Sequence, residues 1–300
     1  VSILMTSPLA KGLFQRAIGE SGGFFEPVQL APRYLLANAE HDGEVFAKSL
    51  GVASVAALRK LSAADLLKGK AGSLSHPVIE PYLLPETPYD SFAAGRQSDV
   101  PILVGSNAEE ARALTDVRGV TAANFAADIE KMFGQLPPPL IAAYPFANDD
   151  EAKRARIAFE TDLRFGWDMW AWARLHAARG RKVFYYRFTQ KPPFPDGSVY
   201  AGWGASHFAE LWYVFGHLDQ APWRWSASDR RLESAITDYW VNFAKSGNPN
   251  ANGLPVWPAF AAAEGPAMNL GEPFDARDVA GLKALQVFDA VYGQLRAAPL

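Results

Sequence analysis

The amino-acid sequence predicts an α/β fold with a mainly parallel β-sheet flanked by helices. Two short apolar runs, at 101–104 and 183–188, stand between turn-forming residues, as buried parallel strands do. Longer stretches with the apolar spacing of helices separate them, and this alternation is typical of the α/β class. The chain has 300 residues, 49% of them hydrophobic, which is enough for one large domain with a sizeable core.

The first hundred residues are expected to contain mainly short elements. In order along the chain these are a helix end at 1–6, a strand at 14–18, a helix at 32–50 closed by Gly51, two helical turns within 55–67, and a strand at 101–104 followed by a Gly-Ser-Asn turn at 105–107. The remainder is predicted to be richer in helix. Its expected elements are a mostly helical stretch at about 115–180 broken by Pro137–Pro139, a strand at 183–188, a loop at 191–206, a long helix capped by Ser228 and ended at 247–249, and a closing helix at 282–295.

Composition and charge exclude several kinds of function. The net charge of -3 gives no electrostatic basis for binding nucleic acid or an anionic membrane. The absence of cysteine excludes disulfides, thiolate catalysis and cysteine zinc sites. No apolar run reaches the ~18 residues of a membrane span, and no H-E-x-x-H or comparable ligand spacing indicates a metal hydrolase. We therefore expect no nucleic acid, no membrane and no metal.

The pentapeptide Gly19-Glu20-Ser21-Gly22-Gly23 has the G-x-S-x-G pattern of a hydrolase nucleophile elbow. In such an elbow a strand precedes the serine and a helix begins at once, so that its first amides face the developing oxyanion. A strand candidate does precede Ser21, but two glycines and Pro27 follow it, and they make a poor first helical turn. The local context favours a buried serine at a strand end over a nucleophile.

His207 is the histidine best placed for catalysis. It lies in a loop at the entry to an aromatic stretch, where an imidazole can reach both an acid and a nucleophile. His41 and His176 fall within helical patterns, His76 precedes a proline, and His217 ends an apolar run. His41 and His176 are expected to be packed or solvated helix residues.

Glu109 and Glu110 are the candidate acids, because they follow the strand predicted at 101–104. Chemistry in open α/β sheets lies beyond the carboxyl ends of the strands, where a carboxylate can orient an imidazole. The competing interpretation is that both acids start a surface helix and favour its dipole. The pattern alone does not choose between these interpretations, nor between the two acids.

Four segments together carry a specific resemblance. They are SPLAKGLFQRAIGESG at 7–22, VPILVGSNAEE at 100–110, GASHFAELWYVFG at 204–216 and YWVNFAKSGNPN at 239–250. With these segments in this order, the chain resembles the carboxyl-terminal part of a type-B carboxylesterase, the family of cholinesterases and bacterial para-nitrobenzyl esterases. The resemblance covers essentially all 300 residues. It implies the α/β-hydrolase fold and, for 1–300, a single domain fragment.

The resemblance implies a carboxylic ester hydrolase with a Ser-His-Glu triad and an acyl-enzyme intermediate. Glu110 stands at the position of the family's acid, with Ala111 where the family usually has glycine, and His207 stands at that of its histidine. Ser21 and the flanking Glu20 match positions behind the acid. The family's nucleophile lies in a separate G-E-S-A-G, about six residues before Val1 by the motif's usual spacing. We therefore expect the chain to be part of a longer protein and to be inactive alone.

The resemblance also indicates a small-molecule ester substrate and no metal or organic cofactor. The helical stretch at about 115–180 is expected to form an insertion over the active-site cleft. Within it, four apolar side chains are candidates for lining an acyl or alcohol pocket, although packing in a helix core is the favoured interpretation for each of them individually: Phe165, Trp167, Met169 and Trp170.

Two other hypotheses remain open from the sequence. Some cholinesterase-like domains lack catalytic residues and bind partner proteins, and a serine or its replacement in the upstream motif would distinguish that class. Alternatively, Ser21 is itself the nucleophile of a smaller hydrolase. Labelling with a phosphonate followed by peptide mapping would separate this hypothesis from the others.

Overall fold

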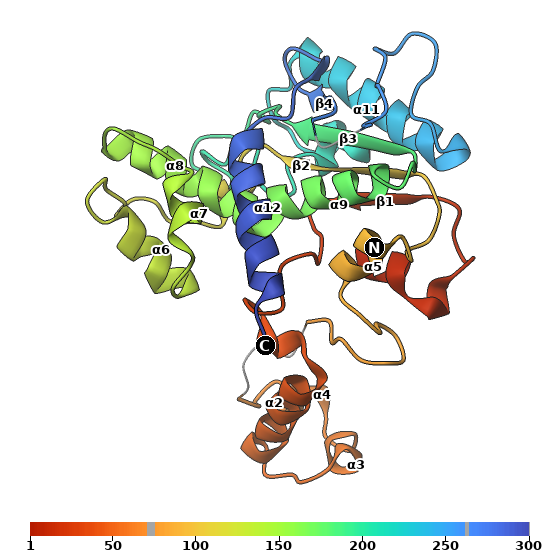
Figure 1. The fold of residues 1–300 in the computed structure, drawn as a ribbon. Helices are drawn as coiled ribbons and strands as arrows, with labels where there is room; N and C mark the ends of the chain where they lie inside the picture. Colours follow the sequence, from red (N-terminus) through yellow and green to blue (C-terminus); the bar gives the residue numbers. More distant parts are fainter. Residues whose placement is uncertain (71–75, 262–263, 300) are drawn as a thin grey trace.

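A five-stranded sheet in the order β1-β2-β3-β4-β5 is the centre of the molecule (Figure 1). The structure is a computed structural model that describes residues 1–70, 76–261 and 264–299. The strands are β1 (Ala17–Glu20), β2 (Ile102–Asn107), β3 (Val183–Phe188), β4 (Ala267–Leu270) and β5 (Ala276–Arg277). The pairs from β1 to β4 are parallel, and only the β4–β5 pair is antiparallel. The predicted α/β fold with a mainly parallel sheet is confirmed.

Helices connect the strands and cover the sheet. The α-helices are α1 (Ser2–Thr6), α2 (Leu36–Ser49), α3 (Val55–Leu58), α4 (Ala63–Leu66), α5 (Pro88–Ala94), α6 (Phe125–Phe133), α7 (Pro138–Ala142), α8 (Asp149–Thr161), α9 (Trp167–Ala177), α10 (Leu211–Val214), α11 (Ala227–Ser246) and α12 (Leu282–Ala297). Short 3₁₀ segments are η1 (Pro8–Ala10), η2 (Pro32–Tyr34), η3 (Glu110–Ala113) and η5 (Leu218–Gln220), and η4 (Asp162–Gly166) is a π-helical turn between α8 and α9.

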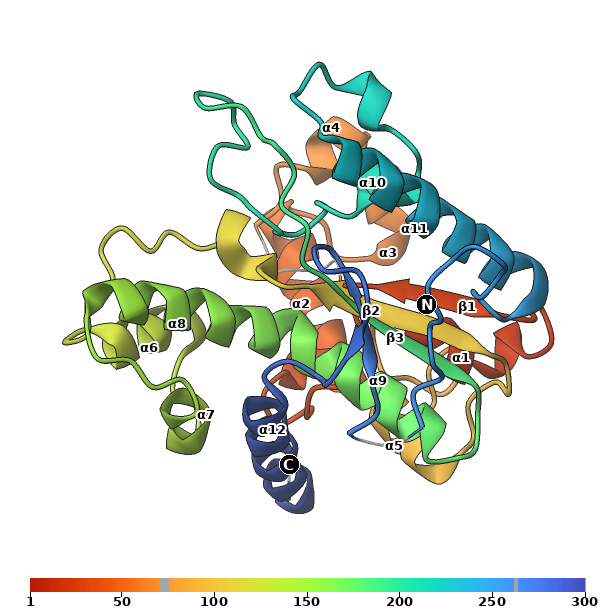
Figure 2. The same ribbon diagram turned by 90° about the horizontal axis from the view of Figure 1, so that it is seen from above.

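The two faces of the sheet carry two separate apolar cores. Alternate residues of a strand point to opposite faces, so Val183 and Tyr185 join the cluster built with α9 and α12, whereas Phe184 joins the one built with α11. Figure 2, seen from above, shows α9 and α11 on opposite sides of β2 and β3. This burial on both faces explains why the strands are continuous apolar runs rather than alternating ones.

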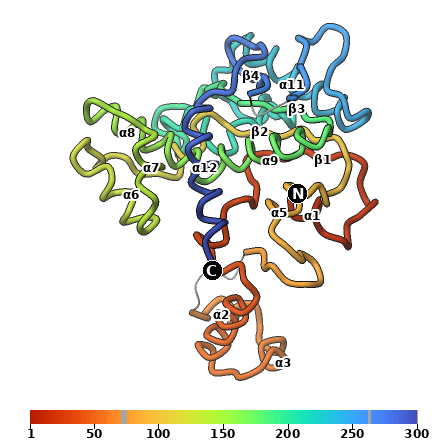
Figure 3. Tube along the Cα trace, in the orientation of Figure 1, coloured from red at the N-terminus to blue at the C-terminus, as the bar shows by residue number. Residues whose placement is uncertain are grey.

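The chain leaves the sheet after β1 and returns only at β2. Figure 3 shows this excursion: α2, α3 and α4 form a group away from the sheet, and α5 leads back towards it. A small cluster of apolar side chains, which includes Phe24, Tyr34 and Leu84, packs where the excursion begins and ends. The predicted helix over 32–50 is therefore a 3₁₀ turn followed by α2, and the two predicted helical turns are α3 and α4.

Two strand predictions need correction. The strand expected at 14–18 is β1, and it begins at Ala17, because its partner in the ladder begins at Ile102. The residues 105–107, expected as a turn, belong to β2 and pair with Tyr186–Phe188 of β3. Gly105 permits this pairing, because an added Cβ would lie 2.3 Å from the carbonyl oxygen of Tyr186.

The cap of the long helix was also predicted wrongly. Ser226, not Ser228, caps α11: its Oγ accepts the N–H of Asp229 at 3.1 Å, and Asp229 Oδ2 accepts the N–H of Ser226 at 2.8 Å. This reciprocal capping box needs an acid three residues after the cap, which only Ser226 has. The predicted end at Gly247 is confirmed, with a left-handed φ of 74°. The closing helix is confirmed as α12, and β4 and β5 were not predicted.

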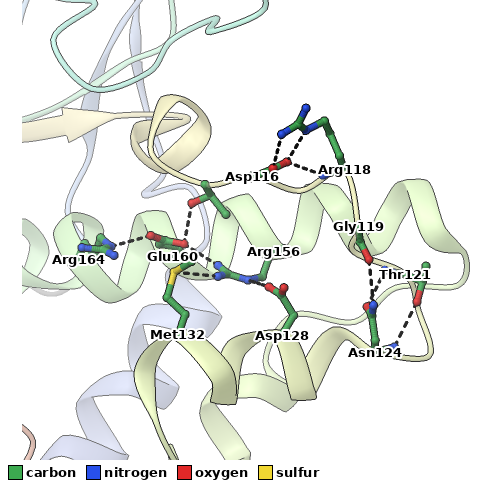
Figure 4. Close-up of polar contacts among 11 residues, drawn as sticks. Asp116, Arg118, Gly119, Thr121, Asn124, Asp128, Met132, Arg156, Glu160 and Arg164 are labelled. Carbon is green, nitrogen blue, oxygen red and sulfur yellow. Dashed lines mark hydrogen bonds and ion pairs between the residues drawn. The ribbon is translucent and has the colours of Figure 1, made fainter.

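The predicted helical stretch at 115–180 is confirmed as α6, α7, α8, η4 and α9. A cluster of ion pairs holds its first half together (Figure 4). Arg156 of α8 is fully buried and contacts Asp128 of α6 at 2.8 Å and Glu160 at 2.6 Å. Arg164 contacts the other oxygen of Glu160 at 2.7 Å. These paired charges fix α6 against α8.

No helix within the described part of the chain combines the length and the apolar character that crossing a membrane requires.

Candidate active site

Polar side chains gather beyond the carboxyl ends of the parallel strands. Glu20 is the last residue of β1 and Ser21 follows it, while Asn107 ends β2 and Glu110 begins η3. His207 lies on the loop after β3, and its backbone N–H donates to the carbonyl oxygen of Glu110 at 3.2 Å. Parallel strands end at one edge of the sheet, which is where ligands bind in open α/β folds.

His207 and Glu110 form a direct pair. The distance from His207 Nδ1 to Glu110 Oε2 is 2.7 Å, and the carboxyl group is fully buried while the imidazole is 20% exposed. A carboxylate only accepts hydrogen bonds, so Nδ1 carries the proton and Nε2 is left as the basic nitrogen. Phe165 and Phe208 flank the imidazole, with ring centroids at 4.7 and 4.1 Å from it. The ring is thus held by its acid and by two aromatic neighbours.

The electrostatic environment raises the pKa of His207 above its usual value of 6.5. Burial acts in the opposite direction, because it disfavours the imidazolium. The hydrogen bond and charge of Glu110, together with the charge of Glu210, outweigh this effect of burial. The site therefore favours a positively charged histidine.

The two adjacent acids have different contacts. Glu110 contacts His207, whereas Glu109 contacts Arg112 at 2.9 Å and accepts the N–H of Ala205 at 3.2 Å. Gly204, next to Ala205, has a positive φ of 59°, and an added Cβ would lie 2.3 Å from Glu109 Oε2. Glu109 thus anchors the loop that leads to His207, and Glu110 orients its imidazole.

Two more buried carboxyl groups lie near Glu110. Burial raises the pKa of Glu210 to about 7, with a further contribution from the charge of Glu110. Burial also raises the pKa of Glu20, although a hydrogen bond of 3.0 Å from Trp240 Nε1 partly opposes this. Tyr186, whose pKa burial raises strongly, is influenced by all three carboxyl charges. The site therefore concentrates negative charge in a region with little solvent.

Ser21 directly follows the last residue of β1. Its N–H donates to the carbonyl oxygen of Gly105 at 2.9 Å, and its φ is 53°. Its Oγ is buried and has no hydrogen-bond partner among the described residues. Residues 22–31 contain no helix, so the strand half of an elbow is present and the helix half is not. A positive φ alone marks a tight turn and does not supply oxyanion amides.

The four candidate pocket residues separate into two groups. Phe165, in the π-turn, contacts the imidazole of His207. Trp167, Met169 and Trp170 are at most 1% exposed and belong to the core between α9 and the sheet. Met169 also accepts the N–H of Gly22 through its sulfur at 3.2 Å. Among these four, Phe165 contacts a catalytic candidate, and Trp167, Met169 and Trp170 belong to the helix core.

The remaining histidines lie elsewhere. His176 is fully buried on α9, where its Nε2 donates to the carbonyl oxygen of Val100 at 2.9 Å, and burial lowers its pKa to about 4. His41 and His217 are exposed, and His76 contacts the carbonyl oxygen of Pro77 at 3.0 Å. The interpretation of His41 and His176 as packed or solvated helix residues agrees with these positions.

Sequence reasoning missed Asn107 and Glu210 as members of the site. Asn107 Nδ2 donates to the carbonyl oxygen of Ser206 at 2.8 Å and to the carboxylate of Glu210. Two signals in the sequence were available. Asn107 is a polar residue at the carboxyl end of a buried strand, and Glu210 is an acid three residues after a candidate histidine. In the parts of the chain that the structure describes, no group of three or more acidic or histidine side chains is arranged to hold a metal ion.

Comparison with known proteins places this geometry in a family. The model of the carboxylesterase family matches residues 1–287. The chain belongs to the carboxylesterase family. Carboxylesterase 5A of Felis catus is 28% identical over an alignment of 287 positions, which covers 88% of this chain and 52% of that protein. The fumonisin B1 esterase of Sphingopyxis macrogoltabida is 28% identical over an alignment of 281 positions, which covers 87% of this chain and 49% of that protein.

Solved carboxylesterase structures share the fold. A thermophilic pNB esterase matches with a TM-score of 0.76 and 26% identity, covering 96% of this chain and 60% of that one. A second pNB esterase matches with a TM-score of 0.73 and 27% identity, over 96% and 60% of the two chains. The sheet and its helices therefore have the α/β-hydrolase fold, and this carboxylesterase chain spans about half the length of the curated relatives it matches.

Proposed function

We propose that the protein to which this chain belongs hydrolyses carboxylic esters of small molecules through a Ser-His-Glu triad. The observation that carries the proposal is the 2.7 Å contact between His207 Nδ1 and Glu110 Oε2 at the carboxyl ends of the strands. In this role His207 Nε2 removes the proton of a serine as it attacks the ester carbonyl, and then returns that proton to the leaving alcohol. Glu110 fixes the tautomer and stabilises the imidazolium.

We place the nucleophile outside the 300 residues, in an upstream G-E-S-A-G motif, as the family resemblance implies. Two features of Ser21 support this assignment. Its side chain makes no described hydrogen bond to His207, and no helix begins within residues 22–31. Ser21 and Glu20 are instead supporting residues behind Glu110. We expect the 300-residue chain alone to hydrolyse no ester, and we place Phe165 against the bound acyl or alcohol group.

His207→Gln and Glu110→Gln test the triad in the protein expressed from its complete reading frame. We expect kcat for short p-nitrophenyl esters to fall about 10⁴- to 10⁶-fold for His207→Gln and about 10⁴-fold for Glu110→Gln. His41→Gln, at an exposed position on α2, is the matched control. Full activity of His207→Gln contradicts the proposal. Loss of phosphonate labelling in Ser21→Ala, with the label mapped to Ser21, instead supports the smaller hydrolase.

The pH dependence of the reaction tests the role of His207 separately. Only the neutral imidazole accepts the proton of the serine, so kcat/KM rises as the pH increases through the pKa of His207. Because the neighbouring carboxylates raise that pKa, the midpoint is expected above 6.5. Steady-state rates between pH 5 and 9 measure it. A flat profile, or a midpoint well below 6.5, would count against His207 as the general base.

A further inference from the structure

Asn107 forms hydrogen bonds both to the candidate acid and to two residues of the loop that carries His207. It is the last residue of β2 and is fully buried. Its backbone N–H donates to Glu110 Oε1 at 2.6 Å, so the oxygen opposite the imidazole is held by the strand itself. The other oxygen of Glu110 is then directed at His207.

The side chain of Asn107 reaches across to the histidine loop. Its Nδ2 donates to the carbonyl oxygen of Ser206 at 2.8 Å and to the carboxylate of Glu210. Ser206 precedes His207 by one residue and Glu210 follows it by three, so the two contacts fall on either side of the imidazole in the chain. Ser206 and Glu210 are buried like Asn107, which shields both hydrogen bonds from water.

The histidine loop needs such contacts because it has little regular structure. Residues 189–210 contain neither helix nor strand, so no backbone ladder fixes the position of His207. Glu109 anchors the loop at Ala205, and Asn107 anchors it at Ser206 and Glu210. Two backbone hydrogen bonds, from the N–H of Glu109 to Ala205 at 3.0 Å and from the N–H of His207 to Glu110 at 3.2 Å, also join the loop to this segment. The distance between His207 and Glu110 therefore depends on these side-chain contacts together with the two backbone bonds.

We propose that Asn107 is a positioning residue that sets the contact between His207 and Glu110, by holding the acid with its backbone N–H and the histidine loop with its side-chain amide. Donating to both Ser206 and Glu210 requires a side-chain amide at this position. Aspartate has the same size but donates no hydrogen bond, and its charge would face Glu110 and Glu210. Serine is too short to reach both acceptors, and alanine makes neither contact. The kinetic consequence rests on the proposed function, whereas the geometric consequence does not.

Asn107→Ala and Asn107→Asp test this proposal in the complete protein. We expect kcat for p-nitrophenyl esters to fall about 10²-fold in both variants, with KM changed less than about threefold, since the misplaced group acts in the transition state. Asn250→Ala is the matched control. Asn250 also uses its side chain for buried backbone contacts, at 2.7 and 2.9 Å to Trp257, but does not contact the site.

The pKa of His207, measured by NMR titration of its imidazole, gives a readout that a purely structural role would not move. It should fall in Asn107→Ala, where the contact with Glu110 loosens, and rise in Asn107→Asp, where a further anion faces the loop. Values equal to wild type in Asn107→Asp, with wild-type kcat, would overturn the proposal even if Asn107→Ala does not fold. If the wild-type protein hydrolyses no ester, the proposed function fails, and the NMR titration still decides the role of Asn107.

Discussion

Two clusters of buried carboxyl groups are stabilised in opposite ways. In the helical cluster of Figure 4, Glu160 is fully buried between two arginines, Arg156 and Arg164, at 2.6 and 2.7 Å, and also accepts the hydroxyl of Thr115 at 2.6 Å. In the site, Glu20, Glu110 and Glu210 accept hydrogen bonds from an indole, a backbone amide and a side-chain amide. Their only described basic partner is His207, which Glu110 contacts.

The helical cluster therefore contributes to stability, whereas the carboxyl groups of the site are suited to a functional role. Paired charges in the helical cluster satisfy one another and hold α6 and α8 together, so the cluster needs no further partner. The carboxyl groups of the site are hydrogen-bonded but not neutralised, and their field is available to stabilise an imidazolium. Burial of these groups raises the pKa values of Glu20 and Glu210, and the charges of Glu110 and Glu210 raise the pKa of His207. The two clusters lie on adjoining segments, since Thr161, next to Glu160, accepts the N–H of Ala111, next to Glu110, at 3.1 Å.

Arg156→Met would break the paired cluster and should have the largest effect on stability. It leaves Asp128 without its partner and Glu160 with one arginine, and removing one member of a buried ion pair typically costs about 3–5 kcal/mol. Urea unfolding of the complete protein measures the loss. We expect kcat of the folded variant to stay within about threefold of wild type, because Arg156 contacts no residue of the site.

Arg118→Met is the matched control in the same region. Arg118 pairs with Asp116 at 2.6 Å, but both side chains are largely exposed, and water replaces such a contact. We expect no measurable change in the urea midpoint. Equal losses in the two variants would show that burial does not distinguish these pairs, and the contrast between the clusters would then fail.

The strands of the sheet were predictable because their signals are local, and the acid–histidine pair was predictable from a resemblance. Continuous apolar runs marked β2 and β3, and a resemblance over four segments selected Glu110 and His207. The ends of elements were less predictable. The end of β2 depends on pairing with Tyr186–Phe188, a contact that lies about eighty residues away in the chain and that no local propensity encodes.

The contacts that hold the histidine loop could not be predicted from the sequence. Asn107 resembles an ordinary turn residue after two small ones, and only the fold brings it to Ser206 and Glu210. Trp167, Met169 and Trp170 show the converse case. Their types suit a pocket, but a helix that covers the face of a sheet buries nearly every side chain, so residue type alone does not separate pocket from core.

Glu210→Gln should raise the free energy of unfolding, whereas Arg156→Met should lower it, and the effect of Glu210→Gln should be the smaller of the two. Glutamine keeps the shape and an acceptor for Asn107, and it removes a charge that the fold does not neutralise. The pKa of Glu210 in the fold is about 7, above its usual 4.5, so the stability that its protonated form contributes is complete below pH 4.5 and is lost as the pH rises through 7. Wild type therefore loses stability across this range relative to the variant.

The difference between Glu210→Gln and wild type should thus grow from near zero at pH 4.5 to about 3 kcal/mol at pH 8, in favour of the variant. Urea unfolding at several pH values measures it, with Glu130→Gln at an exposed position of α6 as the control. Glu20, Glu110, His207 and Tyr186 titrate or carry charge around Glu210, but they are present in both proteins, so the difference isolates Glu210. Parallel pH profiles of the two proteins would mean that Glu210 is neutralised as completely as Glu160. The site would then hold no excess of negative charge, and the raised pKa of His207 would have to come from Glu110 alone.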